Sequence, residues 1–244
     1  LEEDALRILR GLRFGAVLGF EIESDTEKAM RKNKKLLDGI SAERKATELV
    51  KLINGKYAGK IIYEYSDIVD EIIPGIHKLK GFEQYNPYHV HDILKHTCTV
   101  IDNVKSNTDI RIAALLHDIG KPYCHTRDDR GIDHFRGHCG KSKEIAENIL
   151  SRLKFDKKTK ETVLTLIKYH DCYVESDIKI IKRMLGKMGN DIFKLLELRK
   201  GDMYGQNPHF LYRLNDVENA IKSAQEIIDQ GECFSVKDLD KTLK

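Results

Sequence analysis

The sequence predicts an all-α protein, and three observations support this prediction. Apolar residues recur every three to four positions along most of the chain, which is the period of an amphipathic helix. Only 4 of the 244 residues are proline, so few segments are barred from the helical conformation. The hydrophobic fraction of 41% is enough for a core, and no apolar run approaches the roughly 18 residues of a membrane-spanning helix.

We expect the first helix to span residues 4–20, with Gly19 closing its last turn. The inward face of this helix is predicted to carry Leu6, Leu9, Leu12 and Val17. A second helix is expected over residues 24–37, because Ser24 followed by Glu27 has the spacing of a capping box.

The remaining elements follow from the same periodicity. A third helix is expected over Ser41–Ile53, and another near Ile61–Ile72, before a Pro-Gly break at 74–75. After the turn-forming Asn-Pro-Tyr at 86–88, we expect helices over 90–104, 109–117, 139–153, 158–169, 177–186, 190–203 and 210–230. The polar stretch 122–137 is predicted to be a loop, with its turn at residues 128–131.

The most informative pair of residues is His117–Asp118, which follows the apolar run at 112–116. A histidine and an aspartate at the end of a buried helix are costly to desolvate unless a charged partner holds them. A divalent cation is the simplest such partner. The sequence therefore directs attention to further residues that could be metal ligands.

Four such residues lie in the same segment of about a hundred residues. His96 precedes the pair, and His138, His170 and Asp202 follow it. In chain order the series is H, HD, H, H, D, and it resembles the two-metal version of the HD superfamily of metal-dependent phosphohydrolases. A second HD dipeptide, His91–Asp92, lies outside this series, and we interpret it as coincidental. Considered singly, each residue has another reading: a core histidine, a capping or ion-paired aspartate, or Asp171 as ligand in place of His170.

The resemblance implies a ligand set and a chemistry. One ion would be held by His96, His117, Asp118 and Asp202, and a second by His138 and His170, with Asp118 bridging. The implied cofactor is thus one or two divalent ions, such as Mg²⁺, Mn²⁺, Ni²⁺ or Fe²⁺. Asp118 and Lys121 are the expected catalytic residues, and Lys121 is placed to contact a substrate phosphate.

The other histidines give weaker signals. His134, with Arg127, is a possible substrate contact, although a surface role fits both residues as well. We expect the remaining histidines to be structural or exposed: His77, His89, His125 and His209. The five cysteines form no CxxC pair, which predicts reduced thiols in a cytoplasmic protein that is not bound to a membrane.

A second motif lies at the beginning of the chain, Glu3-Asp4-Ala5-Leu6-Arg7. Glu3 and Arg7 have the spacing of an ordinary helical ion pair. The run also resembles the EDxxR helix of bacterial-type CCA-adding enzymes and poly(A) polymerases, and the resemblance continues over nearly the whole chain. It implies that Asp4 and Arg7 bind the base edge of CTP or ATP, and that tRNA or RNA 3′ ends are partners.

The resemblance also implies three parts: a helical neck and RNA-binding region over 1–80, an HD-type helical bundle over 81–205, and a helical tail over 206–244. In that family an N-terminal head with paired aspartates performs nucleotidyl transfer. We expect this chain to lack the head, and to be a phosphomonoesterase or 2′,3′-cyclic phosphodiesterase joined to a tRNA-binding region. The alternatives are a non-catalytic tRNA-binding body with a scaffold HD core, and a free-standing HD nucleotide phosphohydrolase.

Overall fold

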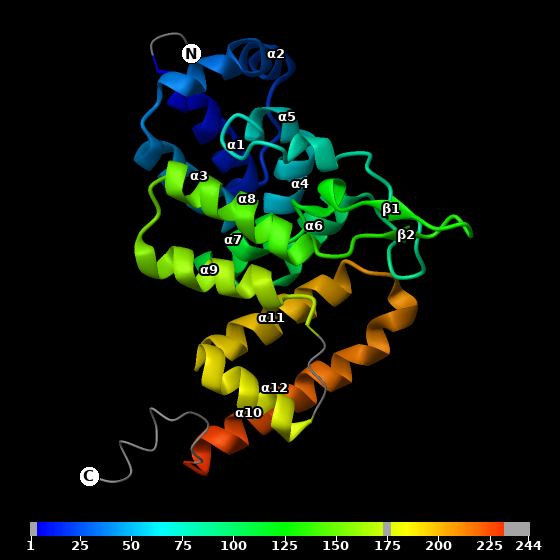
Figure 1. Ribbon diagram of the computed structural model, residues 1–244. Coiled ribbons are helices and arrows are strands. Elements are labelled where there is room, and N and C mark those ends of the chain that lie inside the picture. The colour runs from blue at the N-terminus through cyan, green and yellow to red at the C-terminus, as the bar shows by residue number, and fades with distance from the viewer. Residues whose placement is uncertain (1–3, 173–176, 232–244) are drawn as a thin grey trace.

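The computed structural model describes residues 4–172 and 177–231. Within these ranges the chain is almost wholly helical, with two strands of two residues each, which confirms the all-α prediction. Figure 1 shows the N-terminal helices (blue) at one end of the molecule and the last helix (orange to red) toward the other. A single hydrophobic core runs through both ends, from Leu6 to Ile227.

The N-terminal part is a layer of short helices. Its elements are α1 (Leu6–Leu18), α2 (Ser24–Asn33), η1 (Lys34–Gly39), α3 (Ala42–Ile53), α4 (Ala58–Glu64), α5 (Ser66–Val69) and η2 (His77–Leu79). Helix α1 packs against α3 and α4. Where we expected one helix near Ile61–Ile72, the structure has α4 and α5, and the expected break contains Gly75 with a positive φ of 97°.

Helix α1 ends at Gly19 as predicted, but one of the four residues predicted to face the core, Val17, does not. Gly19 adopts the left-handed conformation with φ 74°, and its N–H donates to the carbonyl of Gly15. Val17, however, is 45% exposed, whereas Ala16 is buried. Val17 lies five residues after Leu12, which is about 140° around the helix, so Ala16 takes the core-facing position instead.

The predicted capping box at the start of α2 is wrong. Glu23, not Ser24, is the N-cap, and its carboxylate accepts hydrogen bonds from the N–H groups of Asp25 and Thr26, each at 2.9 Å. A carboxylate satisfies two free N–H groups and interacts well with the positive end of the helix. Beyond Asn33 the chain tightens into η1, so the α-helix is shorter than expected.

The central helices surround the His-Asp pair. They are α6 (Ile93–Asn103), α7 (Thr108–Leu116), α8 (His138–Arg152), α9 (Lys157–Tyr169) and α11 (Asp191–Tyr204). Helix α7 contacts α6, α9 and α11, so it is enclosed on several sides. All its residues from Ile110 to Leu116 are buried. The apolar run therefore forms the helix at the centre of the bundle.

A short β-ribbon occupies the segment that we expected to be a loop. After η3 (Lys121–Tyr123), strand β1 (Thr126–Arg127) pairs antiparallel with β2 (Asp133–His134). The ribbon projects from the side of the bundle (Figure 1). Each strand has only two residues, so neither produces a recognisable alternation in the sequence.

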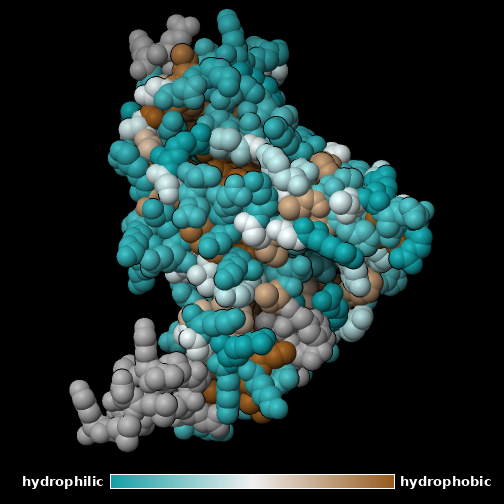
Figure 2. All heavy atoms as spheres, in the orientation of Figure 1, coloured by the Kyte–Doolittle hydropathy of each residue, from teal (hydrophilic) through white to brown (hydrophobic). Residues whose placement is uncertain are grey.

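The C-terminal part consists of α10 (Ile178–Met188), η4 (Pro208–Arg213) and α12 (Leu214–Asp229). Both α10 and α12 pack on α11, which links them to the central helices. The helix predicted over 210–230 is divided, because its first residues form η4. Among the described residues no helix is long and apolar enough to cross a membrane, and the face seen in Figure 2 is mainly hydrophilic.

Gly120 joins α7 to α8 by a contact that leaves no room for a side chain. Its N–H donates to Ser142 Oγ at 2.9 Å. A Cβ at position 120 would lie 2.5 Å from the backbone nitrogen of Ser142 and 2.9 Å from the carbonyl oxygen of His138. The glycine therefore brings the first turn of α8 beside the end of α7.

We predict that Gly120→Ala destabilises the protein by about 1–3 kcal/mol, because the methyl group overlaps backbone that cannot move independently. Urea denaturation measures the free energy of unfolding. Gly140→Ala is the matched control: it lies in α8 with open space around it, and alanine favours the helix there. Equal stability of the Gly120→Ala and Gly140→Ala variants would contradict this packing.

Candidate metal centre

His117 and Asp118 lie directly after α7, and the core buries both. Their exposed fractions are 0% and 1%. His96, on the neighbouring helix α6, is also fully buried. The other HD dipeptide of the chain, His91–Asp92, contains a residue with a structural role. Asp92 is the N-cap of α6, and its side chain accepts a hydrogen bond from the N–H of Lys95 at 2.6 Å.

Four histidines of the series are oriented in the same way. Each ring has Nδ1 at 2.7–3.0 Å from a backbone carbonyl oxygen: His96 at Gly205, His117 at Ala114, His138 at Phe135, and His170 at Ile167. A proton on Nδ1 satisfies each carbonyl and leaves the lone pair on Nε2. This backbone contact is the usual way in which a protein orients a histidine that ligates metal.

The first group of ligand atoms lies between α6, α7 and α11. His96 Nε2 is 3.0 Å from Asp202 Oδ1 and 3.5 Å from Asp118 Oδ2. His117 Nε2 is 3.1 Å from Asp118 Oδ2 and 3.6 Å from Asp202 Oδ1. The two imidazoles approach each other to 3.3 Å between their Nε2 atoms. Four predicted ligands thus converge on one point.

The second group uses the other oxygen of Asp118. His138 Nε2 lies 3.4 Å and His170 Nε2 lies 3.7 Å from Asp118 Oδ1, and the two Nε2 atoms are 3.2 Å apart. Asp118 thus faces both groups, as a bridging carboxylate does. Cys139 Sγ is 3.6 Å from His138 Nε2, and burial raises the pKa of this thiol to about 12.

This arrangement fits divalent cations for an electrostatic reason. Both carboxylate oxygens of Asp118 are buried. Oδ2 faces the ammonium group of Lys121, whereas Oδ1 faces only the Nε2 atoms of His138 and His170. Atoms that each lie about 2.1 Å from one ion at right angles are about 3 Å apart, which is close to the separations found here. The donor set of imidazole and carboxylate suits Mg²⁺, Mn²⁺, Fe²⁺, Ni²⁺ or Zn²⁺.

The pKa values of His117 and Asp118 depend on the charged groups that are buried with them. Burial by itself lowers the pKa of His117, but Asp118 and Asp202 outweigh it and raise this pKa to about 10. Burial likewise disfavours the charged form of Asp118, yet His117 and Lys121 hold its pKa well below the usual value. The buried aspartate therefore stays ionised and demands positive charge nearby.

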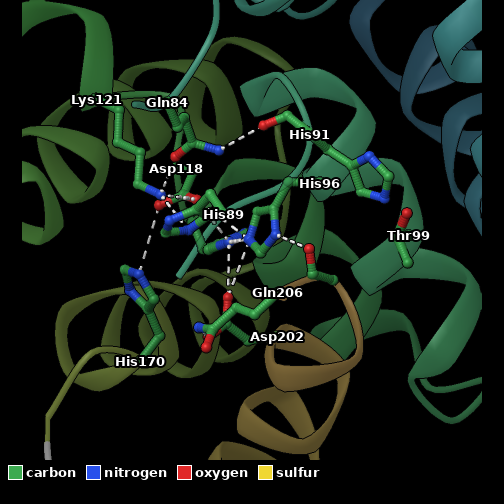
Figure 3. A network of polar contacts seen from close by, with 12 residues as sticks. Gln84, His89, His91, His96, Thr99, Asp118, Lys121, His170, Asp202 and Gln206 are labelled. Carbon is green, nitrogen blue, oxygen red and sulfur yellow. Dashed lines mark hydrogen bonds and ion pairs between the residues drawn. The ribbon is translucent and has the colours of Figure 1, made fainter. Parts of the chain in front are cut away.

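Lys121 supplies one such charge. Its Nζ lies 2.7 Å from Asp118 Oδ2, 2.8 Å from Gln84 Oε1 and 3.4 Å from His89 Nε2. Figure 3 shows these side chains gathered on one side of Asp118, with His96 and Asp202 nearby. His89 is a residue that we expected to be structural or exposed, and the structure places it beside the candidate site instead.

Two further residues support the ligands from α11 and its C-terminal end. Gln206 Nε2 donates to Asp202 Oδ2 at 2.7 Å. Arg199 is buried and donates through Nη1 to the carbonyl oxygens of His170 and Cys172. Sequence reasoning missed both residues. Gln206, four positions after Asp202, has the spacing of a helical neighbour, which is the one signal that could have suggested it.

A cavity of about 380 Å³ opens onto the two groups. Its lining includes Asp118, Lys121, His138, His170, Asp202, His134, Arg136 and His89. His134 thus lines the cavity, with its Nε2 atom 3.1 Å from Asp128 Oδ2. Arg136 is an additional cation there. Arg127 does not line it: its guanidinium makes a bidentate contact with Asp133, at 2.7 and 3.1 Å.

The N-terminal motif lies in another part of the molecule. Asp4 Oδ1 accepts a hydrogen bond from the N–H of Leu6 at 3.2 Å and lies 3.4 Å from Arg44 Nη2. Arg7 is exposed on α1. Neither residue lines the cavity at the HD pair. Glu3 lies outside the described residues.

Comparison with known proteins matches two regions of the chain to described families. Residues 19–79 match the family described as "Probable RNA and SrmB- binding site of polymerase A", and residues 89–195 match the HD domain. The CC-adding tRNA nucleotidyltransferase of Thermus thermophilus is 29% identical over 196 residues, and the A-adding tRNA nucleotidyltransferase of Deinococcus radiodurans is 29% identical over 215 residues. The chain is homologous to tRNA nucleotidyltransferases.

The homology covers most of this chain but less of the relatives. It extends over 75% and 83% of the chain, and over 45% and 49% of the Thermus and Deinococcus proteins. A CCA-adding enzyme of Bacillus pumilus is 42% identical over 97 residues, which are 38% of the chain and 24% of that enzyme. The chain thus spans about half the length, or less, of the tRNA nucleotidyltransferases that it resembles.

We predict that Mn²⁺ raises the melting temperature of the protein after treatment with a chelator. A ligand that binds only the folded state at 100 times its Kd stabilises it by about 2.7 kcal/mol. The shift should be smaller in His170→Ala, which removes one ligand of the second group, and absent in Asp118→Ala, which removes the shared carboxylate.

His91→Ala is the matched control, because it alters the histidine of the other HD dipeptide and leaves the cluster intact. Its melting temperature should respond to Mn²⁺ as the wild type does. An equal response of Asp118→Ala and wild type, each compared with its own chelated form, would exclude this cluster as the metal site.

Proposed function

We propose that this chain is a metal-dependent phosphohydrolase joined to the tRNA-binding, nucleotide-selecting region of a tRNA nucleotidyltransferase. Its substrates are phosphomonoesters or 2′,3′-cyclic phosphodiesters at RNA 3′ ends. The observation that carries the proposal is the pair of ligand groups that share Asp118 at the base of an open cavity. Two adjacent divalent ions held there would activate water and neutralise charge on a phosphoryl group.

The side chains around the cavity suit a phosphate ester. Lys121 and Arg136 supply positive charge, and Arg136 has no ion-pair partner among the described residues. Hydrolysis adds a hydroxyl group to phosphorus, breaks one P–O bond and transfers a proton to the leaving alcohol oxygen. Lys121, fixed by Gln84 and Asp118, is positioned to stabilise the negative charge that develops on the phosphoryl oxygens.

The N-terminal region supports an RNA partner and a nucleotide-selecting role. The homologous domain over 19–79 is described as RNA-binding, and Asp4 with Arg7 offers an acceptor and a donor set for the edge of a base. The basic run at 31–35 is a weaker candidate for phosphate contact. Arg31 and Lys34 bind Asp67, and Lys35 lies 2.9 Å from Glu71.

We predict that the protein with Mn²⁺, Ni²⁺ or Mg²⁺ hydrolyses 2′,3′-cyclic nucleotides or nucleoside monophosphates. His117→Ala should lower kcat/KM by about 100-fold or more, because it removes a ligand, whereas His91→Ala should retain activity. Phosphate release and chromatography of the product measure both reactions. If wild type is as inert as His117→Ala across metals and substrates, the hydrolase proposal is wrong, and tight salt-dependent tRNA binding would then favour the non-catalytic body.

Lys121→Ala separates charge stabilisation from metal binding. Loss of one preorganised donor to a transition-state oxyanion typically lowers kcat by about 100-fold, and we predict a decrease of that size with the Mn²⁺-induced thermal shift retained. Lys141→Ala is the control, because this lysine pairs with Glu144 on α8 at 2.9 Å. Unchanged kcat in Lys121→Ala would remove this residue from the mechanism.

A further inference from the structure

A second cavity adjoins the cavity that opens onto the two ligand groups, which we call the metal cavity. It has a volume of about 440 Å³, within the range of small-molecule sites. Its lining shares with the first cavity Tyr88, His89, Asp171, Asp202 and Gln206, and adds Arg199, Met203, Phe210, Tyr212 and Arg213. The two cavities therefore meet at Asp202 and Gln206, which line both of them.

Three aromatic residues line this second cavity, namely Tyr88, Phe210 and Tyr212. Tyr88 and Phe210 are in contact, with ring centroids 4.8 Å apart. Backbone contacts hold them together, since the N–H of Asn207 donates to the carbonyl oxygen of Tyr88 at 2.8 Å. Tyr88 is 48% exposed and Tyr212 is 68% exposed. Two tyrosine rings thus present open surface at the cavity.

The same cavity is lined by side chains that carry unpaired polar atoms. Arg199 is 7% exposed, and its buried Nε has no hydrogen-bond partner among the described residues. Gln206 donates to Asp202, but its buried Oε1 has no such partner. Arg213, which has no ion pair among the described residues, and Asp171 also line this cavity. An unpaired buried polar atom is costly, so a ligand with donors and acceptors is favoured here.

We propose that this second cavity binds the nucleoside of the substrate, with the base stacked on Tyr212 and Tyr88 and the phosphate in the metal cavity. The inference rests on the hydrolase proposed above and specifies its substrate class. A nucleoside has a π-face for the tyrosines, and ribose hydroxyls and base edges for Gln206 and the arginines. Stacking on aromatic rings recognises single-stranded nucleotides with little sequence preference.

The first test compares two cyclic esters with wild type and Tyr212→Ala. One is adenosine 2′,3′-cyclic phosphate, and the other is glycerol 1,2-cyclic phosphate, which lacks a base. We expect Tyr212→Ala to lower kcat/KM for the adenosine ester by about 10- to 100-fold, and to leave kcat/KM for the glycerol ester unchanged. Tyr204→Ala is the matched control, because Tyr204 is 44% exposed on α11 and lines neither cavity.

An equal effect of Tyr212→Ala on the two esters, or no effect on either, would overturn the nucleoside site. Where wild type hydrolyses neither ester, the cyclic phosphodiesterase activity is excluded, and a second measurement tests the binding site without relying on hydrolysis. The chain contains no tryptophan, so Tyr212→Trp introduces a single fluorescent reporter at the cavity.

The second test titrates Tyr212→Trp with AMP and, separately, with glycerol 2-phosphate, first with Mn²⁺ and then with a chelator. We expect saturable quenching by AMP, because the base stacks on the indole, and none by glycerol 2-phosphate. The Tyr204→Trp variant should show no saturable quenching. Absence of quenching by AMP in Tyr212→Trp would overturn the site even if the esters are hydrolysed.

Discussion

The structure depends on the burial of one ionised carboxylate, that of Asp118, at the end of a wholly buried helix. Its neighbours His117 and His138 direct their Nε2 atoms toward it because backbone carbonyl oxygens fix their Nδ1 atoms. Asp118 and Asp202 concentrate negative charge here, and Lys121 and a protonated His117 offset part of it. The packing of α6, α9 and α11 around α7, and of α8 on α9, holds this otherwise unfavourable cluster in place.

The cluster also determines where substrate chemistry can occur. The ligand atoms are rigid, because the four histidines are buried or nearly so and sit at the ends or in the middle of packed helices. The rims of the two cavities come from less regular segments: the stretch around Tyr88, the β-ribbon with His134, and η4 with Tyr212. Proteins often recognise ligands with residues on loops that a rigid scaffold of helices or strands positions.

Much of the fold and of the candidate ligand set could be predicted from the sequence, because helical periodicity and the H, HD, H, H, D series are local signals. The neighbours of the ligands could not be predicted in this way. His89 reaches Lys121 only because a turn-rich segment folds back over the bundle, and Arg199 reaches the carbonyl oxygen of His170 across helices. The β-ribbon could not be predicted because two-residue strands have no measurable period. Glu23 could not be predicted as the N-cap of α2 because local backbone geometry decides which of several neighbouring polar side chains reaches the free N–H groups.

The central claim is that the two groups sharing Asp118 hold two divalent ions side by side. Electron paramagnetic resonance of the protein titrated with Mn²⁺ tests this most directly, because ions a few ångströms apart couple magnetically. We expect the signal of isolated Mn²⁺ to be replaced by that of a coupled pair as two equivalents bind, and Asp118→Ala to lose the coupled signal. A titration in which every added ion gives only the free, uncoupled signal would contradict the claim.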